Sequence, residues 1–320
     1  MRHLNIITLA AAAVLALASC QEKYITYSGP SYIAFPDTLS ICPVQQNGVP
    51  FDLVVASTNT SDHDRTFGVE VVASKSNAIY GHHYRLESQT VVIPAGERTA
   101  NIRVIGNYDN VAADDSLSVT LSLVSAEDEN WELYGQQTRI LLKKICPFDI
   151  HNFEGWCRVT SSFWLQYSSS LDYSRLVKAE VVDDHTVVIK DFLMDDFDIT
   201  MTFDNSDIVN PVITMGDEQI IGDTRVPFNY IYGDGYIRAY EAPIDWTIDI
   251  CGRFAITYMT LYVKNVGTIG TYVNIIEWLT DEEVALYSRS VGYMSVNTNC
   301  IPDFPRVCDI FGQLWSATNG

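Results

Sequence analysis

The sequence predicts an all-β protein with two domains, an N-terminal β-sandwich and a C-terminal antiparallel β-barrel or sandwich. Short runs rich in Val, Ile, Thr and Tyr recur along the whole chain, and Gly, Pro, Asn and Asp separate them. The composition is that of a globular protein, with 47% hydrophobic and 19% charged residues. At 320 residues the chain is longer than a single hydrophobic core usually supports.

The first twenty residues resemble the export signal of a bacterial lipoprotein. A basic start precedes an apolar run over residues 4–17, which is shorter than the roughly 20 residues that cross a bilayer. Leu17-Ala18-Ser19-Cys20 resembles a lipobox, which implies that a signal peptide (residues 1–19) is removed and that Cys20 is lipidated, with palmitate among the acyl chains. The alternative is an ordinary signal peptide that ends in Cys.

The residues that follow Cys20 indicate where such a lipoprotein would reside. Gln21-Glu22-Lys23 resembles the surface-export signals of Bacteroidetes lipoproteins. The resemblance implies an outer membrane lipoprotein, held to the membrane by its acyl chains and exposed at the cell surface. Residues 20–29 are then a linker between the anchor and the first domain.

The first domain is predicted from evenly spaced strand patterns. Strands at roughly ten-residue spacing are typical of an antiparallel sandwich. The clearest runs are residues 51–56, 68–73, 90–93, 100–105, 117–124 and 138–142.

A motif in this region resembles Calx-beta domains. Residues 78–84 and 90–97, which end in Pro-Ala-Gly-Glu, resemble the family's A-x-x-G-x-D-Y and T-x-x-I-P-A-G-E patterns. The resemblance implies an immunoglobulin-like sandwich over residues 30–146. His83 stands where the family has Asp, which weakens any transfer of the calcium binding seen in some members.

The second domain is predicted over residues 147–320. Lys143-Lys144 and Cys146-Pro147 interrupt the strand pattern, and 25 of the 37 aromatic residues lie after residue 148. Phe153-Glu154-Gly155-Trp156 opens a strand in a way that resembles lipocalin-like barrels. One short helix is expected after Thr280, because Thr is a good N-cap and acidic residues follow it.

Six cysteines remain after Cys20, an even number that permits up to three disulfides in an exported protein. Cys300 and Cys308 are close together and form the favoured pair. The alternative is that the thiols are free and buried. No C-x-x-C occurs, so a thioredoxin-like site and a zinc knuckle are not supported.

The candidate ligand-binding surface lies within residues 226–246. Tyr232-Gly233-Asp234-Gly235-Tyr236 predicts a β-hairpin. With a three-residue loop, period-two alternation places six side chains on one face. They are Phe228, Tyr230, Tyr232, Tyr236, Arg238 and Tyr240. Such a row suits sugar rings, whose C–H faces stack on aromatic rings while tyrosine hydroxyls bond sugar hydroxyls.

Two alternatives remain for this segment. A two-residue Asp-Gly turn would shift the register by one and separate the facing pairs. The rings could also form the core of a tyrosine-rich domain and face no ligand at all.

Metal and cofactor binding are not expected. Two acidic groups offer oxygen ligands that calcium prefers, but neither has EF-hand spacing, and such runs are usually solvated loops. The groups are Asp195, Asp196, Asp198, Asp204 and Asp207, and Asp109, Asp114 and Asp115.

The sequence favours a non-catalytic envelope protein. It contains no G-x-S-x-G, H-E-x-x-H, Walker or dinucleotide motif, so we expect no enzyme activity. A net charge of −20 excludes nucleic acid as a partner, because phosphate backbones are repelled. The leading hypothesis is binding of an extracellular ligand such as a glycan. The alternatives are a structural or adhesive component that binds an envelope protein, and a carrier with an internal cavity.

Overall fold

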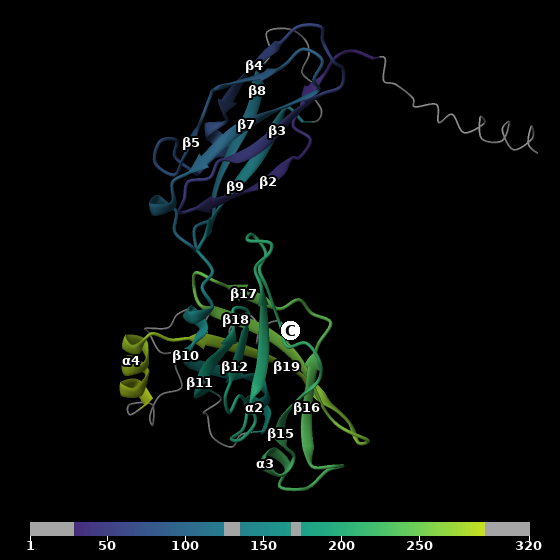
Figure 1. The fold of residues 1–320 in the computed structure, drawn as a ribbon, viewed down its shortest axis with the longest axis vertical. Coiled ribbons are helices and arrows are strands. Elements are labelled where there is room, and N and C mark those ends of the chain that lie inside the picture. The colour runs from purple at the N-terminus through teal and green to yellow at the C-terminus, as the bar shows by residue number, and fades with distance from the viewer. Residues whose placement is uncertain (1–28, 125–134, 168–173, 292–320) are drawn as a thin grey trace, which may run out of the picture.

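The structure is a computed structural model that describes residues 29–124, 135–167 and 174–291 (Figure 1). Strands dominate these residues, which confirms the all-β fold class. The buried hydrophobic side chains form two separate clusters, one from residues 33–142 and one from residues 150–278. The two halves lie end to end, joined by the segment after residue 145.

The described residues of the N-terminal half form nine strands and two short 3-10 helices. They are β1 (Ile33–Ala34), β2 (Leu39–Gln45), β3 (Phe51–Ser57), β4 (Arg65–Val71), η1 (Ala73–Lys75), β5 (Tyr84–Leu86), β6 (Thr90–Ile93), β7 (Thr99–Gly106), η2 (Tyr108–Asn110), β8 (Leu117–Val124) and β9 (Gln137–Ile145). They form two sheets, in the orders β1-β3-β7-β5 and β2-β9-β8-β4-β6. The sheets enclose one core to which strands contribute alternate residues, such as Leu53 and Val55 of β3.

The pairing departs from the predicted antiparallel sandwich at one edge. Strand β2 runs parallel to β9, from Leu39 beside Arg139 to Gln45 beside Ile145. This strand contains Pro43, which lacks an N–H and is therefore tolerated at a sheet edge. Cys42 and Val44 of β2 are both buried in the core.

The C-terminal half forms one ten-stranded sheet whose paired strands are all antiparallel. Its order is β14-β13-β12-β11-β10-β19-β18-β16-β15, and β17 pairs with β18. The strands are β10 (Gly155–Ser161), β11 (Ser174–Asp183), β12 (Thr186–Ile189), β13 (Ile199–Asp204), β14 (Val212–Thr214), β15 (Gln219–Asp223), β16 (Tyr236–Glu241), β17 (Thr247–Asp249), β18 (Phe254–Val263) and β19 (Gly267–Trp278).

A side chain links the two ends of this curled sheet. The Gln219 carboxamide of β15 donates to the Thr200 carbonyl of β13 and accepts from the Thr200 N–H, both at 2.8 Å. It also donates to the Met215 carbonyl at 2.8 Å. The carboxamide thus takes the place of a backbone ladder between β13 and β15.

Large side chains fill the inside of the curled sheet. Phe153, Phe163, Phe192 and Trp278 are almost completely buried there. Ser161 Oγ also donates to Asn274 Oδ1 at 2.7 Å, so these two buried polar groups are paired.

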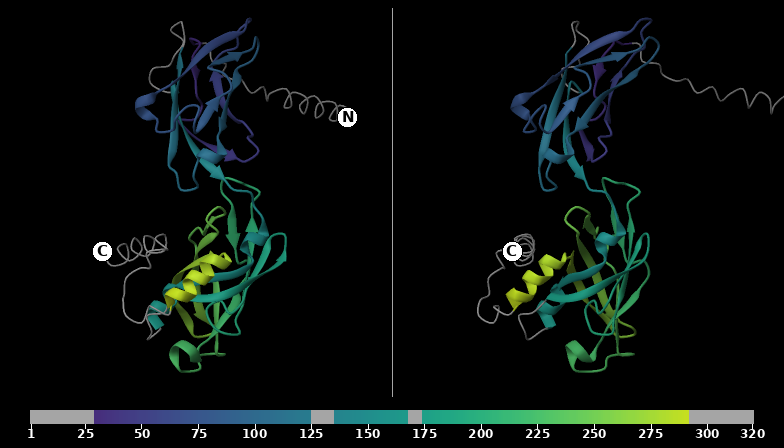
Figure 2. Two further views of the ribbon diagram at one scale, coloured as in Figure 1. Left: turned by 90° about the vertical axis from the view of Figure 1, so that its left-hand side faces the viewer. Right: turned by 60° about the vertical axis from the view of Figure 1, so that its left-hand side comes forward.

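In the part of the C-terminal half that the structure describes, four short helices accompany this sheet: η3 (Ile150–Phe153), α2 (Ser162–Tyr167), α3 (Arg225–Phe228) and α4 (Asp281–Val291). The helix expected after Thr280 is confirmed as α4, which lies along one side of the sheet (Figure 2). Its start is capped reciprocally, because Glu283 N–H donates to Thr280 Oγ1 and Thr280 N–H donates to the Glu283 carboxylate. Within the described ranges, no helix has the length and apolar character needed to cross a membrane.

One disulfide joins Cys146, just after β9, to Cys251 in the turn between β17 and β18. Cys42 and Cys157 are free and buried, and burial raises the pKa of the Cys42 thiol to about 12. The favoured pair, Cys300 and Cys308, lies outside the described residues, as does Cys20.

Candidate functional site

The predicted hairpin over residues 226–240 is wrong. Strand β16 pairs with β15 and β18, and the residues before it form α3 and a loop. Pro227 cannot donate to a strand ladder but fits a short helix, and Asn229 ends that helix in the left-handed region with φ 52°. Phe228 therefore does not face Tyr240, and Tyr232 does not face Tyr236 across a ladder.

Five of the six predicted residues instead divide into two groups, and the sixth, Arg238 of β16, is buried. Phe228, Tyr230 and Tyr232 lie in α3 and the loop after it, at the end of the molecule farthest from the N-terminal half (Figure 1). Tyr236 and Tyr240 lie on the outer face of β16 and are each a little over 40% exposed. The alternation that places these last two side chains on one face is confirmed.

Aromatic rings cluster around α3. Tyr230 is 62% exposed and Tyr232 is 41% exposed, with ring centroids 4.9 Å apart. Phe228 and Tyr232 pack edge to face, with ring centroids 5.6 Å apart and an angle of 87° between the ring planes. Tyr232 thus packs on the half-buried Phe228, and Tyr230 packs on Tyr232.

This cluster is anchored in the hydrophobic core. Phe228 meets Tyr167 of α2 at 5.1 Å, and Tyr167 in turn meets the fully buried Phe163 at 4.9 Å. Because each ring contact restricts the next ring, the exposed tyrosines are held in a defined orientation.

Hydrogen bonds and close packing fix the loop that carries the tyrosines. The Tyr232 N–H donates to Oγ1 of the buried Thr224 at 3.1 Å, and Gly235 N–H donates to the Tyr232 carbonyl at 2.8 Å. Gly233 has φ +54°, and a Cβ there would lie 2.7 Å from the Lys264 carbonyl oxygen. The loop therefore packs directly on the turn between β18 and β19.

Exposed aliphatic side chains accompany the rings. Val226, Ile231 and Val266 are 59%, 57% and 56% exposed. Val266 borders Gly233, and Ile231 borders Gly235, so these side chains adjoin the tyrosine loop. We call the set Val226, Phe228, Tyr230, Ile231, Tyr232 and Val266 the tip surface.

Arg238 is engaged within the protein. Only 9% of it is exposed, and its guanidinium pairs with Asp234 at 2.6 Å and with Glu218 at 3.4 Å. The hydrogen bond from Arg238 holds the pKa of the Asp234 carboxyl below its usual value. An arginine held by two carboxylates is poorly placed to bind a ligand in addition.

Several of the acidic residues weighed as calcium ligands have other partners. Asp195 pairs with Arg175, and Asp198 pairs with Lys190 at 2.9 Å. Asp207 accepts hydrogen bonds from Val209 and Asn210 in its own loop. No group of three or more potential metal ligands occurs in the part of the chain that the structure describes.

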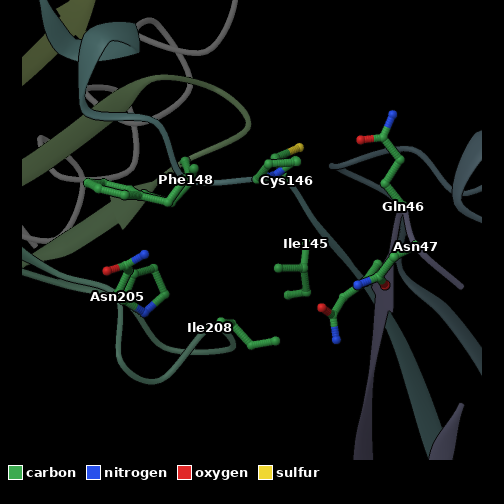
Figure 3. A pocket seen from close by; sticks show the side chains of 11 residues that line it. Gln46, Asn47, Ile145, Cys146, Phe148, Asn205 and Ile208 are labelled. Atoms are coloured by element: carbon green, nitrogen blue, oxygen red, sulfur yellow. The ribbon is translucent and has the colours of Figure 1, made fainter. Parts of the chain in front are cut away.

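A cleft of about 500 Å³ lies between the two halves (Figure 3). Its walls come from the turn after β2, from the segment after β9, and from the loop between β13 and β14. Sequence reasoning did not find this cleft, because its walls come from segments far apart along the chain, between Gln45 and Ile250. Its lining residues are Gln45, Gln46, Asn47, Ile145, Cys146, Pro147, Phe148, Asn205, Ile208, Pro211 and Ile250.

Residues 133–288 match a family model described as a domain of unknown function (DUF4984). The match runs from just before β9 into α4 and so covers the whole C-terminal sheet. None of the curated proteins matches the sequence.

Solved structures with a similar arrangement of strands include three of interest. One is the Calx CBD1 domain, with 12% identity, 36% of this chain and 98% of that domain covered, and a TM-score of 0.30. Another is a candidate carbohydrate binding protein from Bacteroides ovatus. It has 11% identity and a TM-score of 0.30, and the match covers 79% of this chain and 83% of that protein. The third is an auxiliary nutrient binding protein from Bacteroides thetaiotaomicron. It has 12% identity and a TM-score of 0.29, and the match covers 80% of this chain and 94% of that protein. TM-scores this low carry no inference about function.

Proposed function

We propose that this protein is a lipid-anchored envelope protein that binds an extracellular glycan at its tip surface, without catalysis. The observation that carries the proposal is the pair Tyr230 and Tyr232, which are exposed yet held by contacts that reach the core. Sugar rings stack on such faces, and tyrosine hydroxyls bond sugar hydroxyls. Because the rings are already ordered, little side-chain entropy is lost when a ligand binds.

The position of the tip surface supports this role. It lies at the end opposite the N-terminal half (Figure 1). An anchor at Cys20 would place the N-terminal sandwich between the membrane and the tip, as a spacer that displays the C-terminal half. Growth with labelled palmitate tests the anchor: the wild type is expected to incorporate label, and Cys20→Ala to incorporate none.

The absence of catalysis is proposed from the chemistry of the tip surface. Its six side chains are aromatic or aliphatic, and none of them is a carboxylate, histidine or thiol. Hydrolysis of a glycosidic bond ordinarily needs two carboxyl groups placed across that bond. The tip surface offers affinity and shape to a ligand but lacks such a pair of carboxyl groups.

A glycan array tests the proposal, using the full chain purified in detergent. The wild type is expected to bind one class of glycan, and Tyr230→Ala/Tyr232→Ala to lose that binding. Tyr236→Ala/Tyr240→Ala is the matched control, since it also removes two exposed tyrosines of the same half but leaves the tip intact. Binding that survives at the tip variant would refute the site, and a folded wild type that binds no glycan would refute the ligand class.

The exposed aliphatic residues favour a second candidate function, a component of an envelope assembly that binds protein. Val226, Ile231 and Val266 present apolar surface beside the tyrosines, as protein interfaces do. Ile231→Asp separates the candidates. It should abolish a protein contact centred on the aliphatic side chains, whereas a glycan stacked on Tyr230 and Tyr232 should still bind.

A further inference from the structure

We propose that the cleft between the two halves is a second binding site, which takes a short uncharged oligosaccharide. It shares no residue with the tip surface, so this inference goes beyond the proposed function and does not depend on it. Its volume of about 500 Å³ falls within the range of roughly 300–1,000 Å³ that is typical of small-molecule sites.

The lining has the polarity of a sugar site. Four of its eleven side chains are carboxamides, and none is charged, although the protein carries a net charge of −20. A carboxamide both donates and accepts, which matches neighbouring sugar hydroxyls. Apolar surface from Phe148, Ile208 and Pro211 lies beside them and suits the C–H faces of a sugar ring. The carboxamides belong to Gln45, Gln46, Asn47 and Asn205.

These carboxamides are free to bind. Within the described residues, the side chains of Gln45, Gln46 and Asn205 make no hydrogen bond. The Asn47 oxygen accepts from the Val49 N–H at 3.3 Å, which leaves its NH₂ group unused. Polar groups that converge on a cleft and lack protein partners are those that a ligand can satisfy.

The wall from the C-terminal half is fixed by its own hydrogen bonds. Asp204 accepts from the Ser206 N–H at 2.9 Å, and Asp207 accepts from the Val209 N–H at 2.9 Å. Asp207 also accepts from the Asn210 side chain at 3.1 Å. The loop that carries Asn205 and Ile208 is therefore ordered without a ligand.

Two links hold the walls together. The Cys146–Cys251 disulfide ties the segment after β9 to the turn between β17 and β18, and Cys146 and Ile250 both line the cleft. Across the cleft, the Lys143 ammonium at the end of β9 donates to the Val209 carbonyl. The site is therefore preformed, so binding does not have to bring its walls together.

Calorimetry and hydrogen–deuterium exchange on the full chain in detergent test the proposal. The probes are cellotriose, maltotriose, xylotriose and mannotriose, with trigalacturonic acid as the charged counterpart. We expect at least one neutral trisaccharide to bind and to slow exchange in residues 45–49 and residues 204–211 together. Trigalacturonic acid should bind at least tenfold more weakly, because none of the eleven lining side chains is a cation and the nearby Lys143 ammonium already donates to the Val209 carbonyl.

Variants assign the binding to the cleft. Gln46→Ala/Asn205→Ala should weaken binding by about tenfold or more, since each lost hydrogen bond is worth about 1 kcal/mol. Asn101→Ala removes an exposed asparagine of β7 outside the cleft and should leave binding unchanged.

Two results would overturn the cleft site. One is that no neutral trisaccharide slows exchange in both segments. The other is binding that survives at Gln46→Ala/Asn205→Ala but is lost at Tyr230→Ala/Tyr232→Ala, which would assign the ligand to the tip surface and leave the proposed function standing. Binding lost only in the cleft variant would support the cleft site.

Discussion

The rings of Phe228 and Tyr232 meet edge to face, with centroids 5.6 Å apart and planes at 87°. Phe228 is half-buried and in turn contacts Tyr167, whose ring packs on the core residue Phe163. The half-buried Phe228 thereby sets the orientation of Tyr232, which a ligand can reach. Binding at the tip surface should therefore be sensitive to substitutions beneath it.

Phe228→Ala is expected to weaken glycan binding about as much as Tyr232→Ala does. The substitution removes the ring that positions Tyr232 and should lower the free energy of unfolding by about 1–3 kcal/mol. Phe51→Ala is the control, because Phe51 is also half-buried but packs on the N-terminal core. It should cost similar stability and leave binding unchanged. A Phe228→Ala protein that binds with wild-type affinity would contradict the positioning role.

Gly233→Ala is expected to destabilise the tip loop by about 1–3 kcal/mol. Gly233 has a positive φ, and the added Cβ would lie 2.7 Å from the Lys264 carbonyl oxygen. Gly216→Ala is the matched control, since Gly216 has φ +66° but a Cβ added there would meet no heavy atom within 4 Å. Urea unfolding of both variants should show the larger loss for Gly233→Ala. Equal losses would mean that the close approach to Lys264 is unimportant.

Removal of the disulfide, by Cys146→Ser/Cys251→Ser, is expected to lower the free energy of unfolding by about 2–4 kcal/mol. The bond closes a long loop, with a sequence separation of 105, so it restricts the unfolded chain. The unfolding midpoint in urea, compared with that of the wild type without reductant, measures the effect. An unchanged midpoint would contradict a stabilising bond.

Gln219→Leu is expected to loosen the junction between β13 and β15. Leucine has similar size but leaves the Thr200 N–H, the Thr200 carbonyl and the Met215 carbonyl without this partner. The expected loss is about 1–3 kcal/mol, with faster amide exchange at Thr200. Gln89→Leu, at an exposed glutamine, should cost less than about 0.5 kcal/mol. Unaltered exchange at Thr200 would show that the carboxamide does not hold the sheet ends together.

The pairing of Asp234 with Arg238 predicts a pH dependence. The hydrogen bond from Arg238 lowers the pKa of the Asp234 carboxyl from its usual 3.8. A carboxyl whose pKa is lower in the folded state stabilises that state above its unfolded pKa, and this contribution is lost as the pH falls through the folded pKa. The gap in urea midpoint between the wild type and Asp234→Asn should therefore narrow as the pH falls below about 4. A gap that stays constant down to about pH 2 would contradict the shift.

Much of the strand structure could be predicted from local pattern. The runs at residues 90–93 and 117–124 coincide with β6 and β8, and in β6 exposed and buried residues alternate with a period of two. The helix after Thr280 could also be predicted, because its capping residues lie close together in the sequence. Local signals of this kind require no knowledge of distant neighbours.

The candidate site was only partly predictable. The segment was identified from its tyrosines, but the hairpin assumption overlooked Pro227, which signals a break in strand pairing. Strand β16 pairs with β15 and β18 rather than with the residues that precede the turn, and its register depends on tertiary packing. The Cys146–Cys251 bond and the cleft join segments far apart in sequence, so spacing alone gives no signal for either.

Fluorine NMR of the full chain with 3-fluorotyrosine in place of tyrosine tests the central claim most directly. Single Tyr→Phe variants assign the resonances, and a glycan found on the array is then titrated into the labelled protein. We expect the resonances of Tyr230 and Tyr232 to shift in proportion to saturation, while those of Tyr240 and Tyr262 stay in place. Binding that leaves the Tyr230 and Tyr232 resonances unmoved would contradict the tip surface as the glycan platform.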